Sequence, residues 1–177
     1  MIYCVLQIVG LYTISRVKGK NFLKRILGID PALAQAGWGV IEVSGSSLKF
    51  IACGEIKTNA KQPMCERLGV LATSIRAIMK EYDPDEVAIE ETFVNNNGQS
   101  TLKLGQARGA LIAGVAGEGL PMAEYAARLV KKAVTGNGAA EKQQIIAMVK
   151  MLMPNAVISS EDAADALAVA ICHANHS

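Results

Sequence analysis

The chain has 177 residues, of which 51% are hydrophobic and 19% are charged. This length is enough for one domain with an extensive core, and the composition excludes an intrinsically disordered protein. The formal net charge of +2 gives no overall electrostatic case for a nucleic-acid partner, so any surface that binds DNA or RNA has to be local.

Residues 1–25 differ in composition from the rest of the chain. Residues 1–12 are mostly apolar and residues 15–25 are basic, whereas a secretory signal places its positive charge before the apolar segment. The apolar segment is also shorter than the roughly 20 residues that span a bilayer. The five charged residues of this segment are all Lys or Arg, which leaves 13 Lys and Arg against 16 Asp and Glu in residues 26–177. We therefore expect an N-terminal extension over residues 1–25 that is not part of the fold, and a single domain over residues 26–177.

The first half of this domain has the pattern of a small sheet followed by a helix. Residues 25–30 form a short apolar segment that ends at an Asp-Pro turn, as a central strand would. Residues 37–43 and 48–56 are rich in β-branched and aromatic residues, and the Ser-Gly-Ser-Ser between them favours a hairpin. Residues 64–82 carry apolar side chains at the spacing of an amphipathic helix.

The second half alternates between strand and helix patterns. A strand is predicted over residues 85–93, a polar loop follows it, and a longer helix is predicted over roughly 99–116. A brief strand over 120–127 and two or three helices complete the chain. Three strands followed by strand and helix in alternation predict an α/β fold, with a mixed sheet and helices on its faces.

Two acids stand at the ends of predicted strands. Asp30 ends an apolar strand, although an Asp before a Pro is also ordinary turn chemistry. In the segment from Val87 to Glu91, alternation places Ala88 and Glu90 on one face of the strand and Ile89 on the other. A sheet covered on both faces would push at least one of the two glutamates inward, while a solvated strand end is the structural alternative.

Two more acids, Asp162 and Asp165, lie in an alanine-rich helix near the C-terminus. Asp162 has a structural explanation, because Ser159 three residues earlier resembles the start of a capping box and because acids in the first turn, Glu161 and Asp162, suit the helix dipole. Asp165 lies one turn further into the helix, where no cap explains it. Residues at i and i+3 project from the same side of a helix, so the two carboxylates repel each other. A divalent cation would relieve both the repulsion and the cost of burial.

Oxygen ligands without His or Cys suit a hard cation such as Mg²⁺ or Mn²⁺. Two such ions activate water and stabilise the leaving oxygen in phosphodiester cleavage, so the acids predict a metal-dependent phosphoryl-transfer site. Cys172, His173 and His176 lie close together and offer a competing metal site, but no second Cys/His cluster completes a zinc site. The four cysteines show no paired spacing, which favours reduced thiols and a cytoplasmic protein.

Several motifs occur in a fixed order between residues 26 and 174: "GIDP", "GWGV", "AIEE", "TLKLGQARGA", "EYAARLVKKAVTGNGAAEK" and "DAADALAVA". With these the chain resembles the RuvC family of Holliday-junction resolvases. The resemblance implies the ribonuclease-H-like (retroviral-integrase-like) fold, with a five-stranded mixed sheet and helices on both faces. It also implies a homodimer that nicks two DNA strands of like polarity, leaving 5′-phosphate and 3′-hydroxyl ends in recombination and repair.

The same resemblance assigns roles to individual residues. The four acidic ligands of the family, which hold two Mg²⁺ (or Mn²⁺) ions, fall on Asp30, Glu90, Asp162 and Asp165. The two catalytic lysines match Lys131 and Lys142, although spacing alone does not separate Lys131 from Lys132 and solvated helix lysines are the plain alternative. Phe93 matches an aromatic residue that stacks on bases beside the cut, a contact worth about 1–3 kcal/mol per base; the alternative for Phe93 is a place in the core.

A local basic zone accompanies these motifs. Residues 95–150 hold seven Lys and Arg against three Glu, and this zone is able to follow a phosphate backbone. Its expected DNA contacts, besides Phe93, are Lys103, Arg108, Arg128 and Lys132. The polar loop from Asn95 to Gly98 is a further candidate for contact with DNA. By resemblance, the partners are a four-way junction, a branch-migration helicase and its junction-binding subunit.

The chain departs from the family pattern at two positions near Asp30. Ala32 and Ala36 stand where the family often has Gly and Thr, which affects the approach to the phosphate but removes no ligand. Two other functions remain open from the sequence. One is a related nuclease or strand-transfer enzyme that acts on another substrate, such as an RNA·DNA hybrid, and the other is a junction-binding protein without catalysis.

Overall fold

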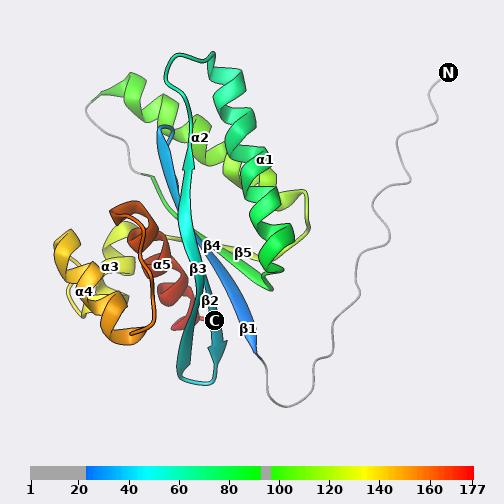
Figure 1. Ribbon diagram of the computed structural model, residues 1–177. Coiled ribbons are helices and arrows are strands. Elements are labelled where there is room, and N and C mark those ends of the chain that lie inside the picture. The colour runs from blue at the N-terminus through cyan, green and yellow to red at the C-terminus, as the bar shows by residue number, and fades with distance from the viewer. Residues whose placement is uncertain (1–22, 93–96) are drawn as a thin grey trace.

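The computed structural model of the chain describes residues 23–92 and 97–177 (Figure 1). Five strands form one sheet in the order β3-β2-β1-β4-β5. The hairpin predicted for residues 44–47 joins β2 to β3, and the two parallel neighbours β1 and β4 lie at the centre. The strands are β1 (Lys24–Asp30), β2 (Gln35–Ser44), β3 (Ser47–Lys57), β4 (Glu86–Glu90) and β5 (Met122–Tyr125).

Pairing in this sheet changes direction at β1. β2 pairs antiparallel with both β1 and β3, whereas β4 pairs parallel with both β1 and β5. The predicted mixed sheet of five strands is therefore confirmed. Because β1 and β4 run the same way, their carboxyl ends lie together at one edge of the sheet.

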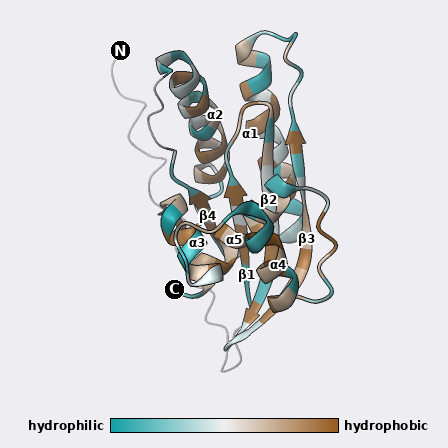
Figure 2. Ribbon diagram, turned by 90° about the vertical axis from the view of Figure 1, so that its left-hand side faces the viewer, coloured by the Kyte–Doolittle hydropathy of each residue, from teal (hydrophilic) through white to brown (hydrophobic). Residues whose placement is uncertain are grey.

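Helices cover both faces of the sheet, as predicted (Figure 1). One hydrophobic cluster lies under α1 and α2, and a second lies under the other three helices. In Figure 2 the strands are largely hydrophobic while the helices alternate between hydrophobic and hydrophilic residues, as amphipathic helices on a buried sheet do. The helices are α1 (Met64–Tyr82), α2 (Gly98–Ala116), α3 (Ala127–Thr135), α4 (Lys142–Leu152) and α5 (Glu161–Ala174).

α5 lies closer to the sheet than a helix with ordinary side chains beneath it would. Gly28 on β1 and Gly37 on β2 face this helix. A Cβ at Gly28 would lie 2.1 Å from the Ala166 carbonyl oxygen, and a Cβ at Gly37 would lie 2.0 Å from the Asp162 carbonyl oxygen. Only glycine allows the backbones to approach this closely. The alanines of α5 and these glycines therefore bring the helix that carries Asp162 and Asp165 directly onto β1 and β2.

Most strand boundaries differ from the sequence prediction by one to three residues, and two of these differences affect the site or the N-terminal segment. β1 begins at Lys24, so Lys24 and Arg25 belong to the sheet and not to the preceding segment. The fourth strand ends at Glu90 and does not continue to residue 93. The carbonyl oxygen of Glu90 accepts from the Arg108 side chain, 3.2 Å away, and the Glu91 N–H still donates to the Tyr125 carbonyl. Among the helices in residues 23–92 and 97–177, none is long and apolar enough to cross a bilayer.

Candidate active site

Asp30 and Glu90 lie side by side at the carboxyl ends of β1 and β4. Parallel pairing sets Ile29 beside Ile89, so the residue that follows each of them ends its strand at the same level. Ile89 packs under α1 and α2, whereas Ala88 packs under α5. Alternation along the strand therefore directs Glu90 toward α5, and Asp30, two residues after Gly28, faces the same helix.

The N-terminal turn of α5 brings Asp162 to this edge. The helix is capped by Ser160, whose hydroxyl accepts from the Ala163 N–H at 3.1 Å, and not by Ser159. The predicted capping box at Ser159 is therefore absent, whereas Glu161 and Asp162 do lie in the first turn, where the helix dipole favours acids. The carboxylate of Asp162 instead accepts from the side-chain amide of Gln35 on β2, at 2.8 Å.

Asp165 faces a lysine that begins the neighbouring helix α4. The ammonium nitrogen of Lys142 lies 3.5 Å from Oδ2 of Asp165 and 3.5 Å from Oε2 of Glu161. Burial acts against the charge of Lys142, but Asp165 and Glu161 outweigh it and raise the pKa of the ammonium group. Lys142 therefore stays charged beside the acids over the whole physiological range of pH.

The structure separates the two adjacent lysines of α3, which spacing alone did not. Lys131 is half-buried, and its positive charge lowers the pKa of both Glu90 and Asp165, which places it on the side of the acids. Lys132 is exposed and lines a hollow with Arg128 and the loop from Gly136 to Gly138. Lys131 is thus the one of the two that belongs to the acidic cluster.

The carboxylates influence one another strongly. Burial raises the pKa of Asp30 to about 7, and the negative charge of Glu90 adds to this shift. Burial raises the pKa of Glu90 to about 7 as well, where Asp165 adds to the shift and Lys131 opposes it. Burial also raises the pKa of Asp165, although Lys142 partly offsets this effect. Like charges in a low-dielectric site cannot all ionise without a compensating cation.

The chemistry of these donors fits a hard divalent cation, although the side chains are not arranged around one. Within residues 23–92 and 97–177, no group of three or more His, Cys, Asp or Glu side chains is positioned to hold a metal ion. The Gln35 side-chain amide donates to the Asp162 carboxylate, and the Lys142 ammonium pairs with the Asp165 carboxylate. A divalent cation held by these two carboxylates would compete with both partners.

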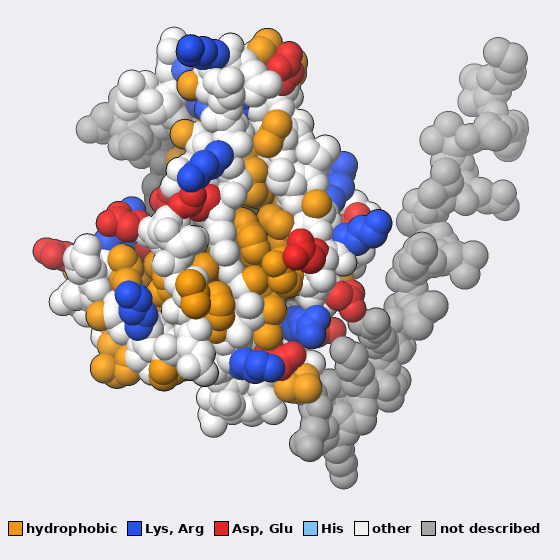
Figure 3. Space-filling view, in the orientation of Figure 1, with side chains coloured by type: hydrophobic (Ala, Val, Ile, Leu, Met, Phe, Trp, Pro, Cys, Tyr) orange, Lys and Arg blue, Asp and Glu red, His pale blue; other side chains and the backbone are white. Residues whose placement is uncertain are grey.

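The residues predicted to contact DNA lie in different surroundings. Lys103 and Arg128 are exposed. Arg108 is largely enclosed, with its guanidinium paired with Glu124 and bound to the Glu90 carbonyl, so it supports the end of β4. Phe93 and the loop residues 94–96 lie outside the described residues. On the face shown in Figure 3, basic and acidic side chains are intermixed around an apolar centre.

The competing Cys and His site is not formed. Both ring nitrogens of His173 are occupied, one by Glu86 and the other by the Tyr125 hydroxyl, each at 2.8 Å. His176 follows the end of α5, and its Nδ1 lies 2.7 Å from the backbone oxygen and 3.9 Å from the sulfur of Cys172. Of the described cysteines, Cys53, Cys65 and Cys172 are free thiols.

Some contributors to the site gave no signal in the sequence. Gln35 lies 127 positions from Asp162 in the chain, and nothing in its neighbourhood indicates a partner. Gly28 and Gly37 were visible only as parts of the "GIDP" and "GWGV" motifs, because a close helix contact cannot be deduced from one strand. Ala36, one of the two departures from the family pattern, is fully buried under α1 and α2 and does not line the site.

Known proteins of one family match nearly the whole of the domain described above. The sequence profile described as crossover junction endodeoxyribonuclease RuvC matches residues 26–173. The protein of that description from Xanthobacter autotrophicus is 55% identical over 152 residues, which is 86% of this chain and 90% of the relative. The one from Methylocella silvestris is 57% identical over 150 residues, covering 85% of each.

Solved structures agree with this assignment. Thermus thermophilus RuvC in complex with a Holliday junction substrate superposes with a TM-score of 0.80 at 29% identity, over 86% of this chain and 94% of that one. The yeast mitochondrial Holliday junction resolvase shares the fold alone, with a TM-score of 0.62 at 13% identity over 86% of this chain and 79% of that one. With this fold, these matches and acids at the edge where β1, β4 and α5 meet, the chain belongs to the RuvC family of crossover junction endodeoxyribonucleases.

Proposed function

We propose that this endonuclease resolves Holliday junctions by hydrolysing one phosphodiester bond in each of two strands of like polarity, and that Asp30, Glu90, Asp162 and Asp165 form its active site. The observation that carries the proposal is their convergence from β1, β4 and α5, which leaves two of them with a pKa near 7. The Thermus relative described above is bound to the same kind of junction.

Membership of the family implies dependence on a divalent metal, and the all-carboxylate donor set supports Mg²⁺, with Mn²⁺ as a substitute. We infer two ions per site, held by the four acids. When bound, such ions lower the pKa of water and stabilise the leaving oxygen. For this to happen, the Gln35 amide and the Lys142 ammonium must give up their contacts with Asp162 and Asp165.

The two lysines of the site have a separate task. Lys142 and Lys131 carry fixed positive charge next to the acids and would hold the scissile phosphate through its non-bridging oxygens. Positive groups placed where charge develops stabilise the transition state more than the ground state. With ions held by the carboxylates, the ammonium group of Lys142 would be able to exchange its contact with Asp165 for one with the phosphate, while Glu161 remains within 3.5 Å of it.

The remaining basic residues would bind the arms of the junction. Lys103, Arg128 and Lys132 are exposed and suit sequence-independent contacts with phosphates, which weaken as salt concentration rises. For Arg108 we favour an indirect contribution through the end of β4, since its guanidinium is already engaged. Phe93 stays a predicted stacking residue beside the cut.

Symmetric nicking requires two active sites, so we infer a homodimer in which each copy cuts one strand. The products would be 5′-phosphate and 3′-hydroxyl ends that a ligase can seal. We also infer that the enzyme acts in the cytoplasm with a branch-migration helicase and its junction-binding subunit; the free thiols support that compartment. The family match begins at residue 26, which supports a single nuclease domain preceded by a short extension.

A cleavage panel with Asp165→Asn tests the proposal. The wild type is expected to nick a synthetic four-way junction in Mg²⁺ and to leave linear duplex and RNA·DNA hybrid uncut. Asp165→Asn should bind the junction with unchanged affinity in a gel-shift assay while its nicking rate falls at least about 10³-fold, because one metal ligand is lost. Equal cutting of linear duplex, or full activity of the variant, would refute the proposed specificity or the proposed site.

A further inference from the structure

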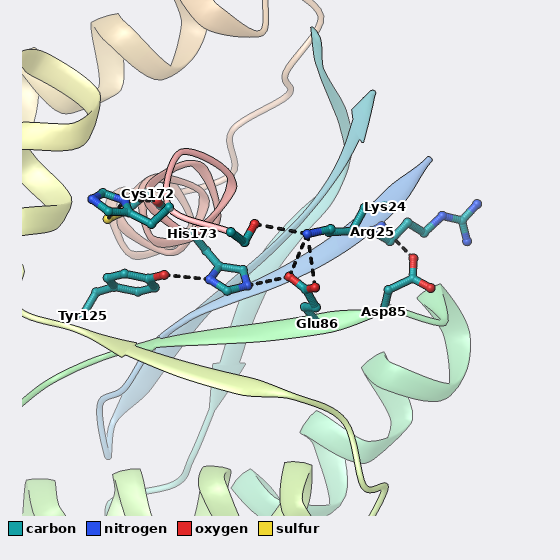
Figure 4. A network of polar contacts seen from close by, with 9 residues as sticks. Lys24, Arg25, Asp85, Glu86, Tyr125, Cys172 and His173 are labelled. Carbon is teal, nitrogen blue, oxygen red and sulfur yellow. Dashed lines mark hydrogen bonds and ion pairs between the residues drawn. The ribbon is translucent and has the colours of Figure 1, made fainter. Parts of the chain in front are cut away.

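A polar cluster lies at the end of α5 opposite the acids. His173 on α5 is 8% exposed, and it is the buried polar side chain of the part of the protein that the structure describes. Figure 4 shows its ring between Tyr125 of β5 and Glu86 of β4, with Lys24 of β1 on the far side of Glu86. Nothing in the proposed mechanism uses this cluster, which joins the last helix to three strands.

Both nitrogens of the imidazole ring have a partner. Nε2 donates to the Glu86 carboxylate, and Nδ1 is hydrogen-bonded to the Tyr125 hydroxyl, so every polar atom of the ring is satisfied. Lys24 Nζ lies 3.1 Å from the other carboxylate oxygen of Glu86 and 3.2 Å from the Ser177 hydroxyl. The ring is therefore held by directional contacts on both sides.

The cluster and the acids occupy opposite ends of the same pair of elements. Glu86 and Glu90 lie on the same face of β4, about 13 Å apart at the usual strand rise. Asp165 and His173 are about 12 Å apart along the α5 axis at the usual helix rise. The span from Glu86 to Glu90 on β4 matches the span from Asp165 to His173 on α5, and the two elements run in opposite directions. When His173 contacts Glu86, Asp165 therefore lies at the level of Glu90.

Between the two ends, α5 contacts β1 mainly through small residues. Beneath the middle of α5, Gly28 meets the backbone of Ala166 and the backbone and methyl group of Ala170. Small residues allow a close approach but supply few of the interdigitating ridges that fix a helix position; the large side chain held closely here is that of Leu167, over Gly39 of β2. At the N-terminal end, the repulsion between acids of α5 and those of the sheet favours separation. A directional contact at the other end of the helix therefore adds to what holds its position along β4.

We propose that His173, held between Glu86 and Tyr125, is a positioning residue of the nuclease site: it sets how far α5 lies along β4 and thereby the separation of Asp162 and Asp165 from Asp30 and Glu90. This inference rests on the proposed assignment of the four acids. Tyr125 adds a second connection to the site, because its backbone pairs with Glu90 and accepts from the Glu91 N–H at 2.9 Å. Tyr125 also stands two residues before α3, the helix that carries Lys131.

Three variants separate positioning from simple stability. Tyr125→Phe removes one hydroxyl and keeps the ring, while Glu86→Ala removes the carboxylate. Glu86→Gln keeps an oxygen that accepts from the His173 ring. The matched control is Glu42→Ala, since Glu42 is also a poorly exposed strand glutamate, paired with Arg25 and Lys49 at 3.5 Å, and its contacts are remote from α5.

The measurements are Mn²⁺ affinity of the DNA-free protein by electron paramagnetic resonance, junction affinity without metal, and single-turnover nicking at saturating Mg²⁺. Tyr125→Phe and Glu86→Ala are expected to weaken Mn²⁺ binding and slow nicking about 10–100-fold, because a displacement of about 1 Å at the reacting groups has effects of this order. Junction affinity should be unchanged, and Glu86→Gln should recover most of the loss. Glu42→Ala should match the wild type in all three measurements.

Unchanged Mn²⁺ affinity and rate in Tyr125→Phe, or equal losses in Glu42→Ala, would overturn the inference. If the Glu86→Ala variant does not fold, the Tyr125→Phe variant alone tests the inference, because it keeps the aromatic ring at position 125 and loses only the hydroxyl. Asp165→Asn distinguishes the two levels of proposal. Inactive Asp165→Asn with fully active Tyr125→Phe would refute only the positioning role, whereas active Asp165→Asn would refute the acid assignment itself.

Discussion

Lys131 and Lys132 are neighbours in sequence with different surroundings. Lys131 lies beside Glu90 and Asp165, whereas Lys132 lines a hollow on the outside of α3. Adjacent residues in an α-helix point in directions about 100° apart, so only one of the two lysines is able to reach the acids. The same geometry predicts different consequences when either is removed.

Lys131→Ala and Lys142→Ala are expected to lower the single-turnover nicking rate about 10²–10³-fold, because each removes a positive charge from the reacting phosphate. Junction affinity should change little in both. Lys132→Ala serves as the control and should keep the rate while making junction binding slightly weaker and less dependent on salt. A larger rate loss in Lys132→Ala than in Lys131→Ala would reverse the assignment of the two lysines.

Single residues also mark where sequence patterns are ambiguous. Ser159 and Ser160 are adjacent and chemically identical, so the N-cap of α5 could not be placed between them by pattern, and the error supplied a false explanation for Asp162. His173 drew attention only as a possible metal ligand beside Cys172. Its partners Glu86 and Tyr125 come from distant strands, and no local pattern predicts them.

The secondary-structure elements were predicted from the sequence more accurately than the contacts of single residues. Apolar periodicity predicted all five strands and the order of the helices, because each element buries one face or both against the core. The predicted end of β4 was wrong by three residues, and the Glu90 carbonyl at the true end of the strand accepts from a side chain of α2, a contact that no local pattern predicts. Periodicity also indicated that Asp165 was costly to bury, but it gave no information on the glycines that seat α5.

Those glycines allow a test of the α5 position. Gly28→Ala would place a methyl group 2.1 Å from the Ala166 carbonyl oxygen, so α5 must move away from β1. We expect a loss of about 2 kcal/mol or more in unfolding free energy and a loss of Mg²⁺-dependent nicking, measured by urea unfolding and junction cleavage. The destabilisation and the loss of activity should occur together.

Gly69→Ala is the matched control for this substitution. Gly69 lies on the exposed side of α1, and a Cβ there meets nothing within 4 Å. Alanine is favoured over glycine in a helix, so the variant should gain about 0.5–1 kcal/mol and keep full activity. A Gly28→Ala variant as stable and as active as Gly69→Ala would show that α5 does not need this close contact.

For the whole molecule, the raised pKa values make stability depend on pH. The pKa of Asp30 is about 7 in the folded protein against 3.8 as the ordinary value, so the folded state binds more protons than the unfolded state between these values. Stability in the absence of metal should therefore fall as pH rises from about 4 to about 7. Glu90 has a pKa shift in the same direction and adds to this loss.

Thermal unfolding of the wild type and Asp30→Asn at pH 5 and pH 8 measures this effect. Without metal, Asp30→Asn should unfold on the order of 5 °C above the wild type at pH 8, with a smaller difference at pH 5. Mg²⁺ should stabilise the wild type at pH 8 and have little effect on the variant, because binding requires the ionised carboxylate. A difference that does not change with pH would contradict the raised pKa of Asp30.

The four acids are also separated in the order of synthesis. Asp30 and Glu90 leave the ribosome on β1 and β4, while Asp162 and Asp165 follow only with α5. Until then, the face of the sheet that α5 covers lacks this helix, and the nascent chain holds only half of the proposed metal ligands. On the proposed assignment of the acids, a translation product that stops before α5 would have no nuclease activity.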